Sequence, residues 1–149
     1  MREALGLAAL ILAAAFTGAA FYITIAEHPA RMLLRVEQAV AQWARSYAQA
    51  AVLQASLAAL GGTCAIAAWL LGGDALFLAG GLIVLANWPW TLFAMKPVND
   101  SLKALSGNHS SAVEALPLLN RWARLHGVRD ALGLVATLLI AGACLRQAV

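Results

Sequence analysis

Four long apolar stretches leave this chain few ways to fold. Three of them run for about twenty residues or more without an internal charge, the length a helix needs to cross the hydrocarbon core of a membrane. They cover residues 4–26, 48–71 and 75–95. The fourth, residues 131–145, has fifteen uncharged residues and is too short to cross alone. It must extend back into the charged segment before it, so we expect the last span over residues 126–145.

The composition agrees with a membrane protein and excludes an ordinary soluble domain. Of the 149 residues, 62% are hydrophobic and 11% are charged. We therefore expect an all-α integral membrane four-helix bundle that forms one domain over residues 1–149. The first stretch should remain as a span, because its apolar part is longer than the core of a cleaved signal peptide. Apolar side chains recur at helical spacing over residues 31–47, which predicts an amphipathic cytoplasmic helix or a cytoplasmic extension of span two.

The basic residues indicate how the bundle sits in the membrane. Eight of the ten Lys and Arg residues lie between spans one and two, between spans three and four, or at the edge of these segments, whereas Arg2 and Arg146 lie on the other side. The positive-inside rule then places both long loops in the cytoplasm and both termini outside, in what we expect to be a bacterial inner membrane. These scattered charges give no indication of a nucleic-acid partner. Cys64 and Cys144 fall inside spans without metal-ligand spacing and are interpreted as packing thiols.

The most unusual polar residues lie where the last span begins. Ionisable side chains such as His126, Arg129 and Asp130 are costly at this depth and usually face the interior of a bundle. At about 100° per residue, Trp122, His126 and Arg129 share one helical sector, which continues into the small residue Gly133. An interfacial arginine alone is ordinary, but a histidine one turn away on the same face is not. We therefore predict a functional role for His126 and Arg129.

Polar and aromatic side chains also occur in the cytoplasmic halves of the other spans. Thr24 and His28 share a face of span one, although Pro29 disfavours α-helical geometry at His28 itself. Spans two and three add the candidates Gln54, Asn87, Trp88, Trp90 and Thr91. Together these positions predict a polar pocket that opens toward the cytoplasm. Purely structural roles stay open, since Thr and Gln commonly bond to neighbouring helices and Trp commonly lies at the membrane interface.

Two short segments leave an internal duplication open. Ala26-Glu-His-Pro29 ends span one and Ala94-Met-Lys-Pro97 ends span three, and both spans run in the same direction. With two matching residues, a parallel two-plus-two repeat and a coincidence are equally compatible with the pattern. The segment Ser106–Ser111 is typical of a loop, in which His109 is expected to be solvated.

Five motifs along the chain carry a resemblance to a known family. They are Thr17-Gly-Ala-Ala-Phe-Tyr22, Glu27-His-Pro-Ala-Arg31, Trp88-Pro-Trp-Thr91, Lys96-Pro-Val-Asn-Asp-Ser-Leu102 and Leu118-Leu-Asn-Arg-Trp-Ala-Arg-Leu-His-Gly-Val-Arg129. In this order they resemble the anthrone oxygenase-like family of small integral membrane proteins, over nearly the whole chain. The family is similar to fungal polyketide-pathway enzymes that oxidise an anthrone to an anthraquinone with molecular oxygen. The resemblance implies an oxygenase in the lipid bilayer with a lipophilic small-molecule substrate.

If that activity carries over, the resemblance implies that one general base is sufficient for the reaction. The methylene of an anthrone is acidic, and its enolate reacts with oxygen without a metal or flavin, so no cofactor is expected. His28 or His126 would be the base, and the sequence does not distinguish between them. Arg129 and Asn99 would stabilise the oxyanion. A flat substrate would contact aromatic and polar side chains of the pocket, which are Trp88, Trp90, Trp122, Asn87, Gln54 and Thr24.

Two alternatives stay open at this point. Glu27, His28 and His126 could supply a two-histidine, one-carboxylate set for iron or copper, which would make the oxygen chemistry metal-centred. A non-enzymatic bundle would instead bind a lipid or quinone-like ligand, or support a larger complex. Small residues in the spans permit close helix contact within one subunit or between two, so a homo-oligomer is also open; these residues are Gly61, Gly62, Gly80 and Gly81.

Overall fold

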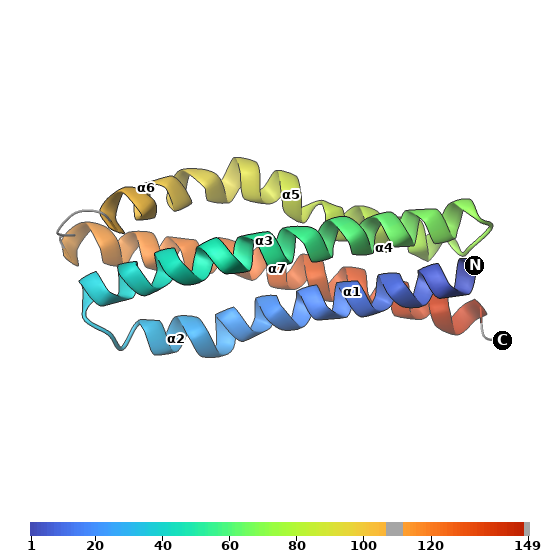
Figure 1. The fold of residues 1–149 in the computed structure, drawn as a ribbon, viewed down its shortest axis with the longest axis horizontal. Coiled ribbons are helices and arrows are strands. Elements are labelled where there is room, and N and C mark those ends of the chain that lie inside the picture. The colour runs from blue at the N-terminus through green and yellow to red at the C-terminus, as the bar shows by residue number, and fades with distance from the viewer. Residues whose placement is uncertain (107–111, 148–149) are drawn as a thin grey trace.

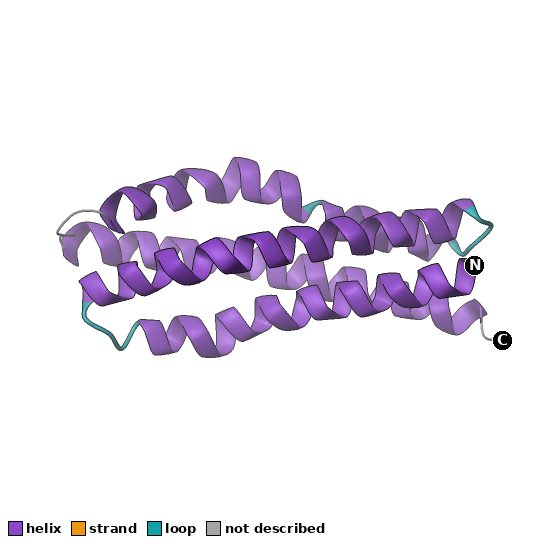
Figure 2. Cartoon of the chain, in the orientation of Figure 1, coloured by secondary structure: helices purple, strands orange, loops and turns teal. Residues whose placement is uncertain are grey.

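The protein is described here by a computed structural model that covers residues 1–106 and 112–147, in which the only regular elements are helices. Figures 1 and 2 show these helices joined into four long rods, each long and apolar enough to cross a membrane. The all-α four-helix membrane bundle expected from the sequence is confirmed. The expected loop after Ser106, including His109, lies outside the described residues.

Two of the four spans are assembled from several helical segments and two are single helices. Span one consists of α1 (Arg2–Tyr22), the π-helix η1 (Ile23–Glu27) and α2 (His28–Arg31). Span two is α3 (Val36–Leu70). Span three consists of α4 (Ala75–Leu85), α5 (Asn87–Trp90), the π-helix η2 (Thr91–Met95) and α6 (Lys96–Ser106). Span four is α7 (Ala112–Gln147).

The two single helices answer two questions left by the sequence. Residues 36–47 belong to the 35-residue helix α3, so the amphipathic segment is an extension of span two and not a separate helix. Likewise α7 passes without interruption through the charged run into the short apolar segment. The last span therefore includes the charged run, as expected, and both helices are longer than their apolar stretches alone.

The spans are arranged as the corners of a square. α1 packs on α3 and α7, and α4 packs on the same two helices, so spans one and three lie on one diagonal. Both described chain ends lie at one end of the bundle with the α3–α4 turn, and the α2–α3 connection lies at the other (Figure 1). We call these the terminal end and the loop end. The α3–α4 turn uses Gly72 at φ +84° and an Asp74 side chain that caps α4 by accepting from the Leu76 N–H at 2.8 Å.

The two ends of the bundle are packed by different kinds of residue. Small side chains fill the terminal end and bring helices close together: a Cβ added to Gly80 would lie 3.0 Å from the carbonyl oxygen of Ala136 on α7. The loop end is filled by larger side chains around Trp43, Met95 and Trp122. The buried polar and charged side chains lie in the middle of the bundle and toward its loop end; they are Thr17, Arg31, Gln54, Asn87, Asn99, His126, Arg129 and Asp130.

A π-helical turn stands before a proline in both spans one and three. η1 ends at Glu27, two residues before Pro29, and η2 ends at Met95, two residues before Pro97. The expectation that Pro29 would keep His28 out of α geometry is wrong, because His28 has φ −65° and ψ −45°. The wide π-turn just before it gives the proline ring room that a regular α-turn lacks. Spans one and three therefore share this local feature, and the two-plus-two repeat stays a prediction.

Candidate functional site

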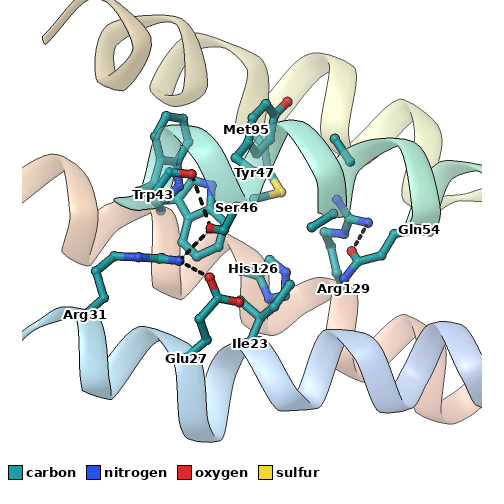
Figure 3. A pocket seen from close by; sticks show the side chains of 13 residues that line it. Ile23, Glu27, Arg31, Trp43, Ser46, Tyr47, Gln54, Met95, His126 and Arg129 are labelled. Carbon is teal, nitrogen blue, oxygen red and sulfur yellow. Dashed lines mark hydrogen bonds and ion pairs between the residues drawn. The ribbon is translucent and has the colours of Figure 1, made fainter. Parts of the chain in front are cut away.

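A small enclosed chamber lies between spans one, two, three and four in the loop half of the bundle. Its volume is about 20 Å³, and because a water molecule needs at least roughly 10–15 Å³ on this measure, the chamber has room for a ligand of one to a few heavy atoms. Figure 3 shows its wall of aromatic, ionic and amide side chains. The lining residues are Ile23, Glu27, Arg31, Trp43, Ser46, Tyr47, Ala50, Ala51, Gln54, Met95, Trp122, His126 and Arg129.

An ion pair from span one closes the chamber toward the loop end. The guanidinium of Arg31 lies 2.5 Å from the carboxylate of Glu27 and donates to Ser46 at 3.0 Å and to Gln42. Gln42 in turn donates to Glu27 at 3.0 Å. Arg31 is only 2% exposed. From the sequence it was expected to be one of the basic loop residues that determine the topology. The signal that could have identified it is the acidic residue four positions earlier on the same helix.

Aromatic rings form one part of the chamber wall. Trp122 is 4% exposed and meets Trp43 edge to face at 6.1 Å between ring centroids. Tyr47 stacks on Trp43 at 5.0 Å, and the Arg31 guanidinium lies 5.6 Å from the Trp122 ring. These contacts make Trp122 a fixed part of the wall.

His126 projects from α7 into the chamber and is 2% exposed. Its Nδ1 lies 3.2 Å from the hydroxyl of Thr24 and 3.6 Å from the carboxylate of Asp130, one turn further along the helix. The first distance is a hydrogen bond and the second only an electrostatic contact. Because Nδ1 is engaged in this way, the other ring nitrogen, Nε2, is the one suited to meet a ligand.

Arg129 is a buried arginine whose hydrogen-bond partners are all neutral. It is 7% exposed and donates to Gln54 Oε1 at 2.6 Å and to Thr91 at 3.3 Å, and its guanidinium lies 5.5 Å from the Phe16 ring. Among the described residues no carboxylate lies within ion-pair distance of it. A buried charge without a direct ion-pair partner is costly, which makes Arg129 a candidate functional residue.

A second, larger cavity adjoins the chamber on the side of spans two and three. This groove has a volume of about 200 Å³ and opens to the outer surface of the bundle, where Trp88 is 48% exposed and Leu92 is 55% exposed. Its wall is shared with the chamber through Tyr47, Ala51, Gln54 and Arg129. The remaining lining residues are Ala55, Ala58, Asn87, Trp88, Thr91 and Leu92.

The structure brings the two predicted histidines to one place. The His28 ring lies 6.0 Å and the His126 ring 4.8 Å from the Trp122 ring between them, so they are no further apart than these two distances together, 10.8 Å. His28 is only half-buried and does not line the chamber, whereas His126 does. Thr24 reaches the site through its hydrogen bond to His126.

The other predicted residues divide between the groove and the surroundings of the chamber. Asn87 and Trp88 line the groove, and Gln54 lines both cavities. Asn99 lines neither and donates to the Tyr47 hydroxyl at 3.2 Å, so it holds a wall residue. Trp90 donates to the Leu125 carbonyl at 3.0 Å and fastens α5 to α7.

A search for relatives gives one informative match. The family model described as anthrone oxygenase matches residues 43–139, which is more than half of the 149 residues. The chain belongs to the anthrone oxygenase family. No curated protein and no solved structure matches it. The family expected from the sequence motifs is thereby confirmed.

The anthrone oxygenase match contains most of the site but not all of it. His126, Arg129 and Gln54 lie inside the matched residues, as does the whole groove. Glu27 and Arg31 lie before its first residue. The ion pair that closes the chamber is therefore contributed by a part of the chain outside the matched region.

The metal-ligand set considered from the sequence does not assemble. Within residues 1–106 and 112–147, no three His, Cys, Asp or Glu side chains are grouped so that they could hold a metal ion. Glu27 is bound to Arg31 and Gln42 instead of facing His126. These residues do not fit an iron or copper centre of the two-histidine, one-carboxylate kind.

Proposed function

We propose that this protein is a membrane oxygenase that oxidises an enolisable aromatic substrate, such as an anthrone, with molecular oxygen. The family supports an oxygenase-like function in general. The observation that carries the more specific proposal is the buried pair His126 and Arg129, which places a base and a positive charge without a direct ion-pair partner one helical turn apart in one chamber. Removing a proton from carbon and stabilising the resulting enolate requires these two groups.

The proposed reaction needs only the substrate, the base and oxygen. His126 lines the chamber and not the groove, so it accepts one proton from the methylene through a water molecule in the chamber, and the enolate passes one electron to O₂. The carbon radical and superoxide then combine into a C–O bond, and the peroxide takes the proton back from His126. Loss of the remaining C–H hydrogen with the outer oxygen yields water, so the methylene becomes a carbonyl that contains one atom of O₂.

Of the two histidines, His126 is the better base. Thr24 and Asp130 both lie beside its Nδ1 and favour the tautomer with the proton on that nitrogen, which leaves Nε2 as the acceptor. His28 is half-buried and lies outside the lining of the chamber. We assign it the supporting role of packing against Trp122.

Arg129 and Gln54 are the better oxyanion donors. Both line the chamber and the groove, so they can meet a substrate oxygen from either side. Asn99 was the other candidate, but its donor is used by Tyr47, and we therefore propose that it positions that ring.

The groove is the proposed binding place of the aromatic rings. It offers about 200 Å³ against about 20 Å³ in the chamber, so a multi-ring substrate fits the former and not the latter. Trp88 provides an aromatic face at the outer edge. Asn87 lies deeper, and its amide nitrogen donates to the Val84 carbonyl. This bond fixes the orientation of the amide, and Asn87 Oδ1 has no partner among the described residues. That oxygen can accept a hydrogen bond from a substrate hydroxyl.

Isotope labelling tests the proposed activity directly. The purified protein in lipid nanodiscs is supplied with anthrone under ¹⁸O₂, and we expect one labelled oxygen in the new carbonyl and one in water, at a rate well above that of protein-free nanodiscs. Binding of anthrone without oxygen uptake would instead identify a ligand-binding bundle. Activity that is lost on chelation and restored by iron or copper would identify the metal-dependent alternative.

We further propose that the loop end is cytoplasmic and that both termini face outward, as expected in a bacterial inner membrane. The proposal rests on the eight basic residues near the loop end against two near the terminal end. A reporter fused after Val149 should be active if it functions only after export and silent if it functions only in the cytoplasm. The opposite pattern would place the chamber in the outer half of the membrane.

A further inference from the structure

The chamber is lined by an unusual number of unpaired hydrogen-bond donors. Five of its residues carry a buried N–H for which the described part of the chain offers no acceptor, although none of the five is more than 7% exposed. Leaving buried donors unpaired is costly and is rare in folded proteins. The five atoms are Arg31 Nη1, Trp43 Nε1, Gln54 Nε2, Trp122 Nε1 and Arg129 Nε.

The orientation of these donors is fixed by their neighbours. Gln54 Oε1 accepts from Arg129, so the amide nitrogen is the end left without a partner. Arg31 uses its other nitrogens on Glu27, Ser46 and Gln42. The indoles of Trp43 and Trp122 can only donate.

Few acceptors balance these donors in the lining. His126 Nε2 accepts in the tautomer assigned above, and it becomes a further donor once His126 has taken a proton. The other buried atoms that can accept and have no partner among the described residues belong to His28, Asn87, Asn99 and Asp130, none of which lines the chamber. Two arginines line it against one carboxylate, that of Glu27. A ligand that suits these groups accepts hydrogen bonds, carries negative charge and has no more than about three heavy atoms, because the chamber has a volume of about 20 Å³.

We propose that the chamber is a binding site for a small oxygen anion, and that its ligand in the reaction is the superoxide formed when the enolate passes one electron to O₂. The identity of this ligand rests on the proposed oxygenase function; the anion site itself does not. The aromatic substrate in the groove and the reduced oxygen in the chamber then meet at the wall formed by Gln54 and Arg129. Donors already in place around the anion stabilise it without reorganisation.

Azide is a suitable probe, because it is a small stable monoanion that accepts hydrogen bonds. Its antisymmetric infrared stretch shifts when the ion leaves water for a hydrogen-bonded site. We expect a saturable shifted band with the intact protein in nanodiscs in the absence of any substrate. In the oxygen-uptake assay azide should inhibit competitively with O₂ and not with anthrone.

Two near-isosteric variants test the location of the anion. Gln54→Glu keeps an acceptor for Arg129 but replaces the unpaired donor by a negative oxygen, and should raise the Kd of azide about tenfold or more. Trp122→Phe keeps the ring and removes one donor, and should raise the Kd about fivefold. It also serves if Gln54→Glu does not fold. The matched controls Gln38→Glu, on the exposed surface of α3, and Trp69→Phe, at the terminal end, should stay within about twofold of the native Kd.

The outcomes separate this proposal from the oxygenase proposal. A shifted azide band that is unaffected by Gln54→Glu and Trp122→Phe, or absent from the native protein, overturns the anion site even if anthrone is oxidised. A Kd of azide that rises in both variants and not in the controls supports the site even if anthrone is not oxidised, and in that case only superoxide as the ligand is refuted.

Discussion

Replacing His126 by alanine should lower kcat for oxygen-dependent anthrone oxidation by about 10²- to 10⁴-fold, the usual contribution of a positioned base. The imidazole lines the chamber and is held at Nδ1 by Thr24, so its Nε2 is positioned as the base. The measurement is oxygen uptake by the purified variant in nanodiscs. His126→Gln is a second variant that keeps a polar partner for Thr24 but cannot act as a base near neutral pH.

Two other substitutions make this result specific. Arg124→Ala alters an exposed side chain two residues away on the same helix and should leave turnover within about twofold. His28→Ala should lower turnover by less than about tenfold, because His28 packs on Trp122 outside the chamber. A large loss in His28→Ala, together with retained turnover in a folded His126→Ala, would reverse the assignment of the base.

Filling the groove should have the second largest effect. Ala55 lines the groove but not the chamber, and its carbonyl accepts from the Trp88 indole at 3.3 Å. Phenylalanine at this position occupies the space proposed for the substrate rings. We expect Ala55→Phe to lower kcat/KM for anthrone by about 10²-fold, the loss that follows displacement of a substrate by about one ångström.

Ser56→Phe is the matched control for this variant. Ser56 is the next residue on α3, is exposed, and does not line the groove, so the same side chain there should change kcat/KM by less than about twofold. Azide binding in the chamber should be unaffected by both variants. Equal loss in the two variants would show that the aromatic rings do not bind in the groove.

The fold could be predicted from the sequence because the membrane imposes strong rules. Apolar length identifies each span, and the fifteen-residue remainder of the last span required the charged run to be helical, as α7 shows. His126 and Arg129 could be singled out for the same reason, since ionisable groups at that depth are rare. Both of these predictions use only the spacing of residues along a single helix.

What joins the site across helices could not be predicted in the same way. The Gln54–Arg129 hydrogen bond links residues 75 positions apart, and no periodicity within either helix specifies that pairing. Arg31 was missed because a basic residue near a span end satisfies the positive-inside rule whether it is exposed or buried. The π-turn that makes His28 helical was missed because the proline rule describes regular α-turns only.

The opening of the groove on the outer surface of spans two and three has a kinetic consequence. A lipophilic aromatic compound and molecular oxygen both dissolve better in acyl chains than in water, so the groove faces the phase in which both reactants are most concentrated. The half-exposed Trp88 would then meet substrate by two-dimensional diffusion. Turnover should accordingly follow the mole fraction of substrate in the lipid, and dilution with added lipid at constant aqueous volume should lower the rate.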